Sequence, residues 1–151
     1  LARYSDTDRI AGLARELGFH VALHTTGCRP DRLQQLVDDR SPVWVGLDMK
    51  AAPEDYQAAS GVATNYFKQM RDSLSLMRAG GVDVEVRSTI YEELAKPDRL
   101  ERLAAVADEL DIRKPVWQVV ARSGRVDQDL KSRLGSFLRQ RGWTERIELR
   151  G

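Results

Sequence analysis

Polar and charged side chains interrupt four short apolar segments of the sequence, each toward the C-terminal end of its segment. They are His24, Asp48, Lys50, Glu85, Arg87 and Gln118. Parallel α/β folds bind their ligands at the carboxyl ends of their strands. An unpaired charge inside a sheet core costs on the order of several kcal/mol, so these groups need partners or a polar ligand. The pattern favours a binding site inside a barrel over a plain apolar core.

A purely structural interpretation of the same charges stays open. Asp48 with Lys50, and Glu85 with Arg87, could form ion pairs on a solvated face, and for one isolated pair this is the commoner situation. The same polarity on four neighbouring segments shifts the balance toward a site. Taken alone, His24 is more often a hydrogen-bonded residue than a ligand or base, and Cys28 is more often incidental than reactive.

The elements that position these side chains can be predicted from hydrophobic periodicity. Period-two alternation predicts strands over residues 19–26, 43–50, 82–90 and 116–121, with a short last strand through Ile147 and Leu149. One face of each strand is expected to pack on helices. In the first two strands this apolar face includes Phe19, Val43 and Val45. The opposite faces carry the polar residues.

One helix is predicted before the first strand, over residues 5–17. Four more are predicted after it: one from residue 30 onward, one from residue 67 to Gly80, one from residue 97 to 110 and one over 127–141. Strict alternation of helix and strand implies right-handed βαβ units and a parallel sheet, an α/β fold. The unit of about 30 residues fits a (βα) barrel or a doubly wound sheet, and periodicity does not distinguish them. We expect one domain over residues 1–151.

Composition excludes several classes of protein. The 151 residues carry 24 Lys+Arg against 23 Asp+Glu, a formal charge of +1, which argues against a nucleic-acid partner. No apolar run approaches the ~20 residues of a membrane helix, and no signal peptide is recognisable, so we expect a cytoplasmic protein without a membrane partner. The chain opens at Leu1 and enters a helix within a few residues, and we interpret it as beginning inside a longer protein.

A family resemblance extends over essentially the whole chain. It starts with His24-Thr25-Thr26-Gly27 and Pro30-x-x-Leu33, continues with Val45-Gly46-Leu47-Asp48-Met49-Lys50, and later includes Glu85-Val86-Arg87-Ser88-Thr89, Trp117-Gln118 and Ile147-Glu148-Leu149-Arg150-Gly151. In this order and spacing, the segments resemble the radical S-adenosylmethionine (radical SAM) activases of glycyl-radical enzymes. The anaerobic ribonucleoside-triphosphate reductase activating proteins are the most similar members.

The resemblance implies a partial (βα) TIM-like barrel, of which this chain would supply the third unit onward. It implies S-adenosylmethionine as cofactor, bound by His24, Thr26, Asp48, Lys50, Arg87 and Gln118. Asp48 and Lys50 would reach the ribose and methionine parts, which suits a carboxylate facing hydroxyl or amino groups and an ammonium facing a carboxylate. The implied partners are a glycyl-radical enzyme such as anaerobic ribonucleoside-triphosphate reductase, and an electron donor such as flavodoxin or ferredoxin.

The sequence departs from this family at the iron–sulfur cluster. Family members hold a [4Fe–4S] cluster with a Cys-x3-Cys-x2-Cys loop and bind the methionine amino group with a Gly-Gly-Glu segment, and neither motif occurs here. Cys28 is the one cysteine, whereas such a cluster needs three or four thiolates. We therefore expect no catalytic residue and no metal ligand in this chain, which should be inactive by itself.

Three other hypotheses remain open. The chain could belong to a radical SAM enzyme that modifies another peptide or a small molecule. It could be a non-catalytic, truncated remnant whose first strand forms an uncovered sheet edge prone to aggregation. It could also be a metal-free barrel lyase or aldolase in which Lys50 forms an imine with a carbonyl substrate.

Overall fold

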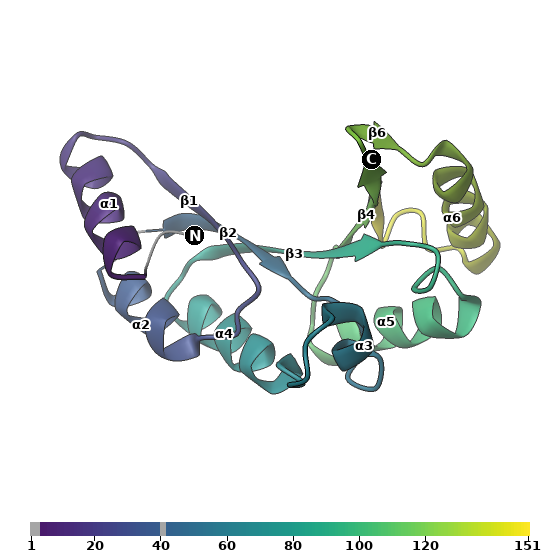
Figure 1. Cartoon of the computed structure of the whole chain (residues 1–151), viewed down its shortest axis with the longest axis horizontal. Helices are drawn as coiled ribbons and strands as arrows, with labels where there is room; N and C mark the ends of the chain where they lie inside the picture. The colour runs from purple at the N-terminus through teal and green to yellow at the C-terminus, as the bar shows by residue number, and fades with distance from the viewer. Residues whose placement is uncertain (1–3, 40–41) are drawn as a thin grey trace. The chain divides into compact units, whose positions relative to one another are not determined.

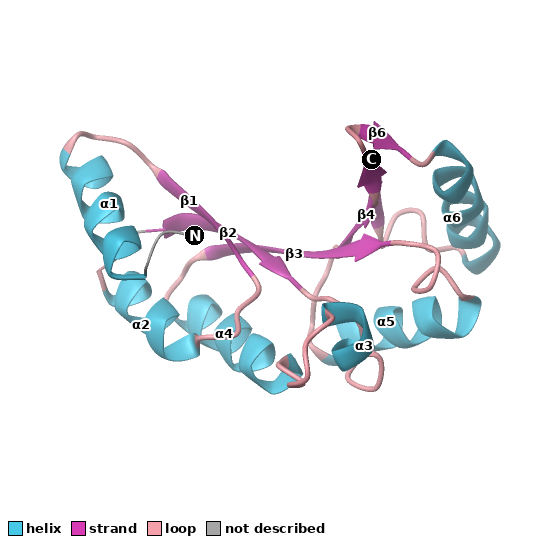
Figure 2. Cartoon of the chain, in the orientation of Figure 1, coloured by secondary structure: helices cyan, strands magenta, loops and turns pink. Residues whose placement is uncertain are grey.

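The computed structural model describes residues 4–39 and 42–151, which fold into six helices and seven strands (Figures 1 and 2). The helices are α1 (Tyr4–Glu16), α2 (Pro30–Asp38), α3 (Tyr56–Ser60), α4 (Phe67–Ala79), α5 (Pro97–Glu109) and α6 (Gln128–Arg141). The strands are β1 (Val21–Thr25), β2 (Pro42–Asp48), β3 (Asp83–Ile90), β4 (Val116–Val119), β5 (Ala121–Arg122), β6 (Arg125–Val126) and β7 (Glu148–Arg150). Helices and strands alternate as predicted.

Five of the strands form one sheet in the order β1-β2-β3-β4-β7, with β1 and β7 at its two ends. The pairs β1–β2, β3–β4 and β4–β7 are all parallel. A parallel sheet needs crossover connections, and α2, α4, α5 and α6 each lie in one. The predicted α/β fold with a parallel sheet is confirmed.

Several helix boundaries follow from local chemistry that the sequence displays. Pro30 and Pro97 occupy the first turns of α2 and α5, where a missing N–H costs nothing. The Asp127 carboxylate caps α6 by accepting a hydrogen bond from Leu130 N at 3.0 Å. Gly142 ends α6 in the left-handed conformation, with φ of 68°.

The chain divides into two compact units. Unit 1 comprises residues 1–47 and 68–85, and unit 2 comprises residues 48–67 and 86–151. Strands β2 and β3 therefore begin in unit 1 and end in unit 2. The expectation of a single domain over residues 1–151 stays a prediction.

Each unit has its own apolar core. In unit 1 the helices α2 and α4 bury Leu33, Leu36, Met70, Leu74 and Met77, and β2 buries Val45 and Leu47. In unit 2 the largest fully buried side chain is Trp117 of β4. It is accompanied by Ile90, Leu100, Leu103, Leu130 and Leu134. No helix in residues 4–39 and 42–151 is both long and apolar enough to cross a membrane.

The prediction for the start of the first two strands was wrong. Phe19 lies before β1 and is exposed, and Val43 is exposed although it was assigned to the packed face. For Val43 the register gives the reason: Val21 pairs with Pro42 and Ala22 with Trp44, so Val43 is an extra residue in the second strand and leaves its alternation. Phe19 is exposed because it lies outside β1, which begins at Val21.

Two elements were not predicted. The fourth strand ends at Val119, and Ala121 belongs instead to an antiparallel hairpin of β5 and β6. Its two-residue turn consists of Ser123 and Gly124, both with positive φ (50° and 73°), the conformation that a tight hairpin requires. The Ser-Gly dipeptide was the available signal. Helix α3 has only five residues, too few for periodicity to reveal.

Candidate functional site

Three of the predicted site residues meet where β2 and β3 end, within unit 2. Lys50 Nζ donates to Asp48 Oδ2 at 2.9 Å, and Arg87 Nη2 lies 3.8 Å from Asp48 Oδ1. All three side chains are partly buried. One carboxylate thus lies between two cations, and the group carries a net charge of +1. We call these residues the Asp48–Lys50–Arg87 triad.

The backbone under the triad is fixed by two hydrogen bonds between the ends of β2 and β3. Met49 N donates to Arg87 O at 2.8 Å, and the buried Ser88 hydroxyl donates to Met49 O at 2.7 Å. Ser88 interrupts the apolar row of β3, and this was the signal by which its role could have been predicted. Because both bonds involve Met49, they hold the residue between Asp48 and Lys50 in place.

Arg87 retains an unused donor. Its Nε is buried and has no hydrogen-bond partner in the described part of the chain. A buried N–H without an acceptor costs about 1–3 kcal/mol, and more for a charged group. The unpaired donor and the net positive charge of the triad together fit a ligand that brings an anionic oxygen, such as a carboxylate.

Gln118 lies on the same face of the sheet as Arg87, one strand away. In the β3–β4 register Gln118 is opposite Thr89, and Thr89 shares a face with Arg87 because side chains alternate along a strand. Gln118 is exposed. No hydrogen bond joins it to the triad among the residues that the structure describes. It is therefore available to a ligand without being part of the triad.

His24 and Thr26 lie at the end of β1, in unit 1. Both side chains are exposed, and the His24 ring contacts the Trp44 ring edge to face, with centroids 5.3 Å apart. The neighbouring Thr25 Oγ1 accepts a hydrogen bond from Gly27 N at 3.1 Å, which tightens the turn after the strand. That His24 and Thr26 share one ligand with the triad stays a prediction.

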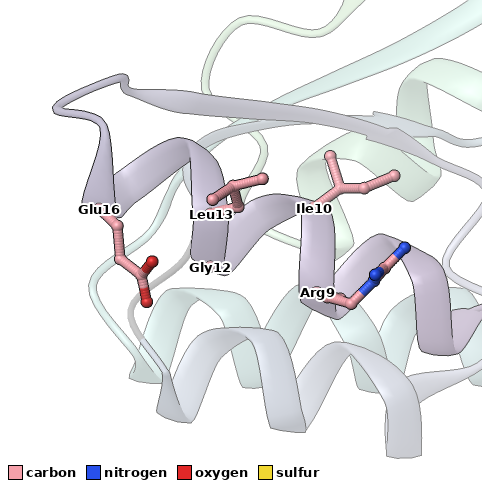
Figure 3. A pocket seen from close by; sticks show the side chains of 5 residues that line it. All are labelled: Arg9, Ile10, Gly12, Leu13 and Glu16. Atoms are coloured by element: carbon pink, nitrogen blue, oxygen red, sulfur yellow. The ribbon is translucent and has the colours of Figure 1, made fainter.

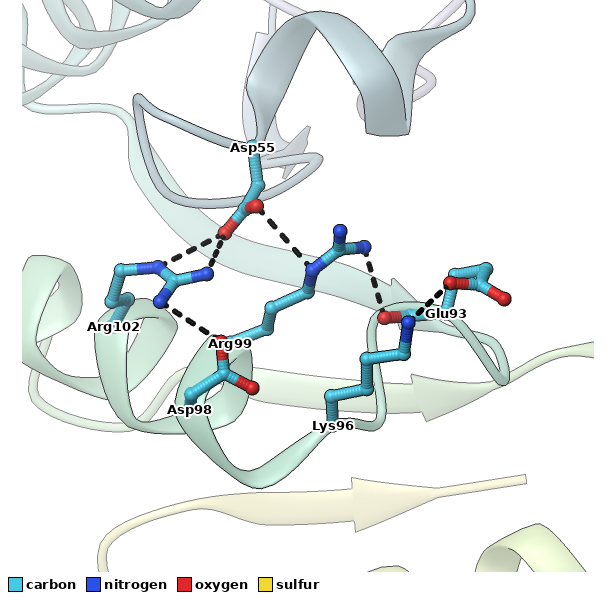
Figure 4. A network of polar contacts seen from close by, with 6 residues as sticks. All are labelled: Asp55, Glu93, Lys96, Asp98, Arg99 and Arg102. Carbon is cyan, nitrogen blue, oxygen red and sulfur yellow. Dashed lines mark hydrogen bonds and ion pairs between the residues drawn. The ribbon is translucent and has the colours of Figure 1, made fainter.

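A second charged network, not predicted from the sequence, follows the triad along the chain (Figure 4). Asp55, only 12% exposed, accepts hydrogen bonds from Arg102 Nε at 3.1 Å and Nη2 at 2.8 Å, and Arg99 Nε lies 3.4 Å from its other oxygen. These bonds raise the pKa of the Arg102 guanidinium, the largest cause being the hydrogen bond to Asp55. Nothing in the sequence pairs these residues, because 47 positions separate Asp55 from Arg102.

The far end of this network lies at the start of α5. Arg99 Nη1 donates to Glu93 O at 3.0 Å, and Lys96 Nζ donates to Glu93 Oε2 at 2.8 Å. The Lys96 hydrogen bond holds the pKa of the Glu93 carboxyl below its usual value. The network ties the segment that follows Lys50 to α5, so it acts as a structural clamp within unit 2.

The residues present do not fit an iron–sulfur cluster. Cys28, the one cysteine of the sequence, is a free and partly buried thiol. Within residues 4–39 and 42–151, no group of three or more His, Cys, Asp or Glu side chains could hold a metal ion. A [4Fe–4S] cluster has three or four thiolate ligands, so this chain alone offers no such set.

Comparison by sequence gives no relative: no protein-family model and no curated protein matches this chain. Comparison by structure, in contrast, finds proteins with a similar fold. The fold is similar to that of native anSMEcpe with bound AdoMet and the Kp18Cys peptide, with a TM-score of 0.65 and 13% identity, covering 98% of this chain and 46% of that one. It is also similar to Streptococcus suis SuiB bound to S-adenosylmethionine, with a TM-score of 0.64 and 12% identity, covering 99% of this chain and 35% of that one.

At this level of identity the similarity shows the fold. The parallel sheet with alternating helices matches part of the TIM-like barrel of these radical SAM structures, which confirms the predicted fold class. The chain spans less than half the length of the solved chains it matches. What those proteins bind therefore enters only as a basis for a proposal about this one.

Proposed function

We propose that this chain is the S-adenosylmethionine-binding part of a radical SAM protein, with the Asp48–Lys50–Arg87 triad contacting the cofactor. The observation that carries the proposal is the buried, unpartnered Nε of Arg87 beside a triad of net charge +1. Support comes from the fold, because the similar solved structures are described with S-adenosylmethionine bound. It also comes from the motifs around Asp48 and Arg87 in the sequence.

The chemistry of the side chains suggests a role for each residue. Arg87 would bind the methionine carboxylate, since a guanidinium forms charge-assisted hydrogen bonds to that group. Asp48 would accept hydrogen bonds from the amino group or the ribose hydroxyls, and Lys50 would orient Asp48 while adding positive charge. Gln118 would complete the site within unit 2, and the cofactor contacts expected of His24 and Thr26, in unit 1, stay a prediction. These residues would bind and orient the cofactor, and we assign none of them a catalytic step.

The particular reaction that we propose is the activation of a glycyl-radical enzyme, with anaerobic ribonucleoside-triphosphate reductase as the partner. It rests on the order and spacing of the sequence motifs alone. When bound, S-adenosylmethionine supplies the 5′-deoxyadenosyl radical that such a reaction uses. The thiolate ligands of a cluster, the flavodoxin or ferredoxin that donates electrons and the cytoplasmic location belong to this proposal for the whole protein.

A second candidate is the modification of another peptide. Two of the similar solved structures hold a peptide as well as AdoMet, with TM-scores of 0.65 and 0.64. The two candidates share the triad and differ in the substrate. In a protein that joins this chain to a cluster-binding segment, a glycyl radical detected by electron paramagnetic resonance on the reductase would support activation. Turnover of a peptide without that radical would favour the second candidate.

The shared part of the proposal is testable on the chain itself. We expect Asp48→Ala, Lys50→Ala and Arg87→Met each to weaken S-adenosylmethionine binding by about tenfold or more, because each removes a charge-assisted hydrogen bond of about 1.5–3 kcal/mol. Isothermal titration calorimetry measures the affinity. Lys68→Ala removes an exposed lysine of α4 and is the matched control. Unchanged affinity in all three variants would exclude the triad as the site.

A further inference from the structure

Helix α1 carries an exposed apolar face and a cavity that is open to solvent. Its large side chains Ile10, Leu13 and Leu17 are 57%, 56% and 67% exposed. The cavity, of about 510 Å³, is lined by Arg9, Ile10, Gly12, Leu13 and Glu16 (Figure 3). None of these five lining residues is buried. Because a buried polar group needs a partner in one fixed place, the buried polar groups of unit 2 constrain the candidate site more closely than this open surface does.

Ser88 is one of two polar residues that the described part of the chain buries, with 2% of its surface exposed. Its hydroxyl donates to Met49 O at 2.7 Å, although 39 positions separate the two residues. In the β3–β4 register Ser88 is opposite Trp117, which is completely buried on the same face of the sheet. Water therefore does not compete for this hydrogen bond, and the low local dielectric strengthens it.

The residue that Ser88 holds lies just beyond the end of a strand. β2 ends at Asp48, so Met49 and Lys50 follow the strand. Met49 is attached to β3 through both of its main-chain polar groups, because its N donates to Arg87 O at 2.8 Å and its O accepts from Ser88. The Met49 carbonyl belongs to the peptide bond with Lys50. Its direction therefore sets the point from which the Lys50 side chain reaches Asp48, at 2.9 Å.

The opposite face of β3 carries Arg87. Side chains alternate along a strand, so Ser88 points away from the face on which Arg87 lies 3.8 Å from Asp48. Without the Ser88 hydroxyl, Met49 O would lose a buried donor, a costly state that a shift of the chain would relieve. The end of β3 thus supplies both a cation of the triad and, on its other face, the hydroxyl that fixes the main chain between the other two residues.

We propose that Ser88 is a positioning residue for S-adenosylmethionine binding. Its hydroxyl holds Met49 O, and Met49 in turn keeps Asp48 and Lys50 beside Arg87 in the arrangement that receives the cofactor. This role rests on the proposed function of the triad. Ser88 itself makes no contact with the cofactor and takes no part in a chemical step. The affinity for S-adenosylmethionine therefore depends on a hydroxyl on the far face of the sheet.

Isothermal titration calorimetry on the full chain tests this role. We expect Ser88→Ala to weaken S-adenosylmethionine binding by about tenfold, because Met49 O loses its donor and the triad is no longer held. Ser88→Thr keeps the hydroxyl on a side chain that suits a strand, so its affinity should stay within about threefold of the wild type. Rescue by threonine distinguishes the hydrogen bond from the volume of the side chain.

Ile147→Val is the control for a general loss of packing in unit 2. It removes a buried methyl group just before β7, two strands away from β3 in the sheet. We expect its affinity for S-adenosylmethionine to stay within about twofold of the wild type.

Hydrogen exchange of main-chain amides, followed by nuclear magnetic resonance, gives a readout that needs no ligand. The Met49 amide, which donates to Arg87 O, should exchange about tenfold faster in Ser88→Ala than in the wild type. In Ser88→Thr it should exchange close to the wild-type rate. The amide of Val119 in β4 is the internal reference, and its exchange should change much less in all three variants.

The outcomes separate this role from the proposed function. An unchanged affinity in Ser88→Ala, with binding weakened in Arg87→Met, would overturn the positioning role and leave the proposed function standing. Equal weakening in Ser88→Ala, Ser88→Thr and Ile147→Val would also overturn it, since general loosening of unit 2 would then explain the loss. A wild type that does not bind S-adenosylmethionine would overturn the proposed function itself, and the role of Ser88 with it.

Discussion

The triad illustrates how far single residues can be interpreted from their type and position along the chain. Asp48, Lys50 and Arg87 were predicted as a group of charges at strand ends, and the structure brings them within 2.9 and 3.8 Å. Glu85 was the partner considered for Arg87, and the structure describes an ion pair of Arg87 with Asp48, from the neighbouring strand. Which carboxylate an arginine reaches depends on strand pairing, and a sequence does not give that.

Gly27 shows a residue whose role depends on its surroundings. Its φ is +66°, and an added Cβ would lie 2.8 Å from Leu47 Cδ1 and 3.2 Å from both Met70 Cα and Ser73 Cβ. Ser73 Oγ also donates to Gly27 O at 2.8 Å. The turn after β1 is therefore packed directly on α4. The sequence marked Gly27 only as the end of a strand.

We expect Gly27→Ala to lower the free energy of unfolding by about 3 kcal/mol, through the left-handed conformation and overpacking together. Gly81→Ala, in the same unit, is the matched control: its φ is +72° but a Cβ there meets nothing within 4 Å. It should cost only about 1 kcal/mol. Urea denaturation compares the two variants. Equal losses would show that the contacts with Leu47 and α4 do not constrain the turn.

At the scale of elements, hydrophobic periodicity predicted the helices and strands that are long enough for the repeat to be visible. The helices α2, α4, α5 and α6 and the strands β2, β3 and β4 all bury an apolar face, and their patterns were visible. Helix α3 and the β5–β6 hairpin were missed because each element is too short for its period to repeat visibly. The position of α3 depends instead on Asp55, which precedes it and pairs with α5 rather than capping its own helix.

Asp55→Ala should therefore destabilise unit 2 by about 2 kcal/mol, because it leaves the guanidinium groups of Arg99 and Arg102 without their shared, largely buried acceptor. Asp98→Ala removes the other carboxylate bound to Arg102, at 3.0 Å, but this side chain is 65% exposed. We expect a much smaller effect from this variant, because solvent screens an exposed ion pair. Urea denaturation of both variants checks the difference. A larger loss for Asp98→Ala would contradict the role given to Asp55.

At the scale of the whole molecule, the fold and the missing ligand set lead to different expectations about cofactors. The fold matches structures that hold S-adenosylmethionine, and the triad offers suitable groups for it. The same chain has a single thiol, Cys28. Binding of S-adenosylmethionine and binding of a cluster should therefore separate experimentally in this chain.

Anaerobic reconstitution with iron and sulfide tests that separation. We expect iron bound per chain to be far below one [4Fe–4S] cluster and to be the same in wild type and Cys28→Ala, since three or four thiolates are needed. Iron analysis and the visible absorption spectrum provide the measurement. A stoichiometric cluster that depends on Cys28 would contradict this, and would point to ligands shared between copies of the chain.

The sequence by itself determined the α/β class, the parallel sheet and the residues of the triad. These follow from alternation along the chain and from the chemistry of single side chains, which are local properties. The tertiary structure alone decided the bulge at Val43, the burial of Ser88 under Met49, the Asp55 network and the exposed face of α1. The first three depend on contacts between residues far apart in sequence, and the last depends on which surfaces other elements leave exposed. Local periodicity carries no information about either property.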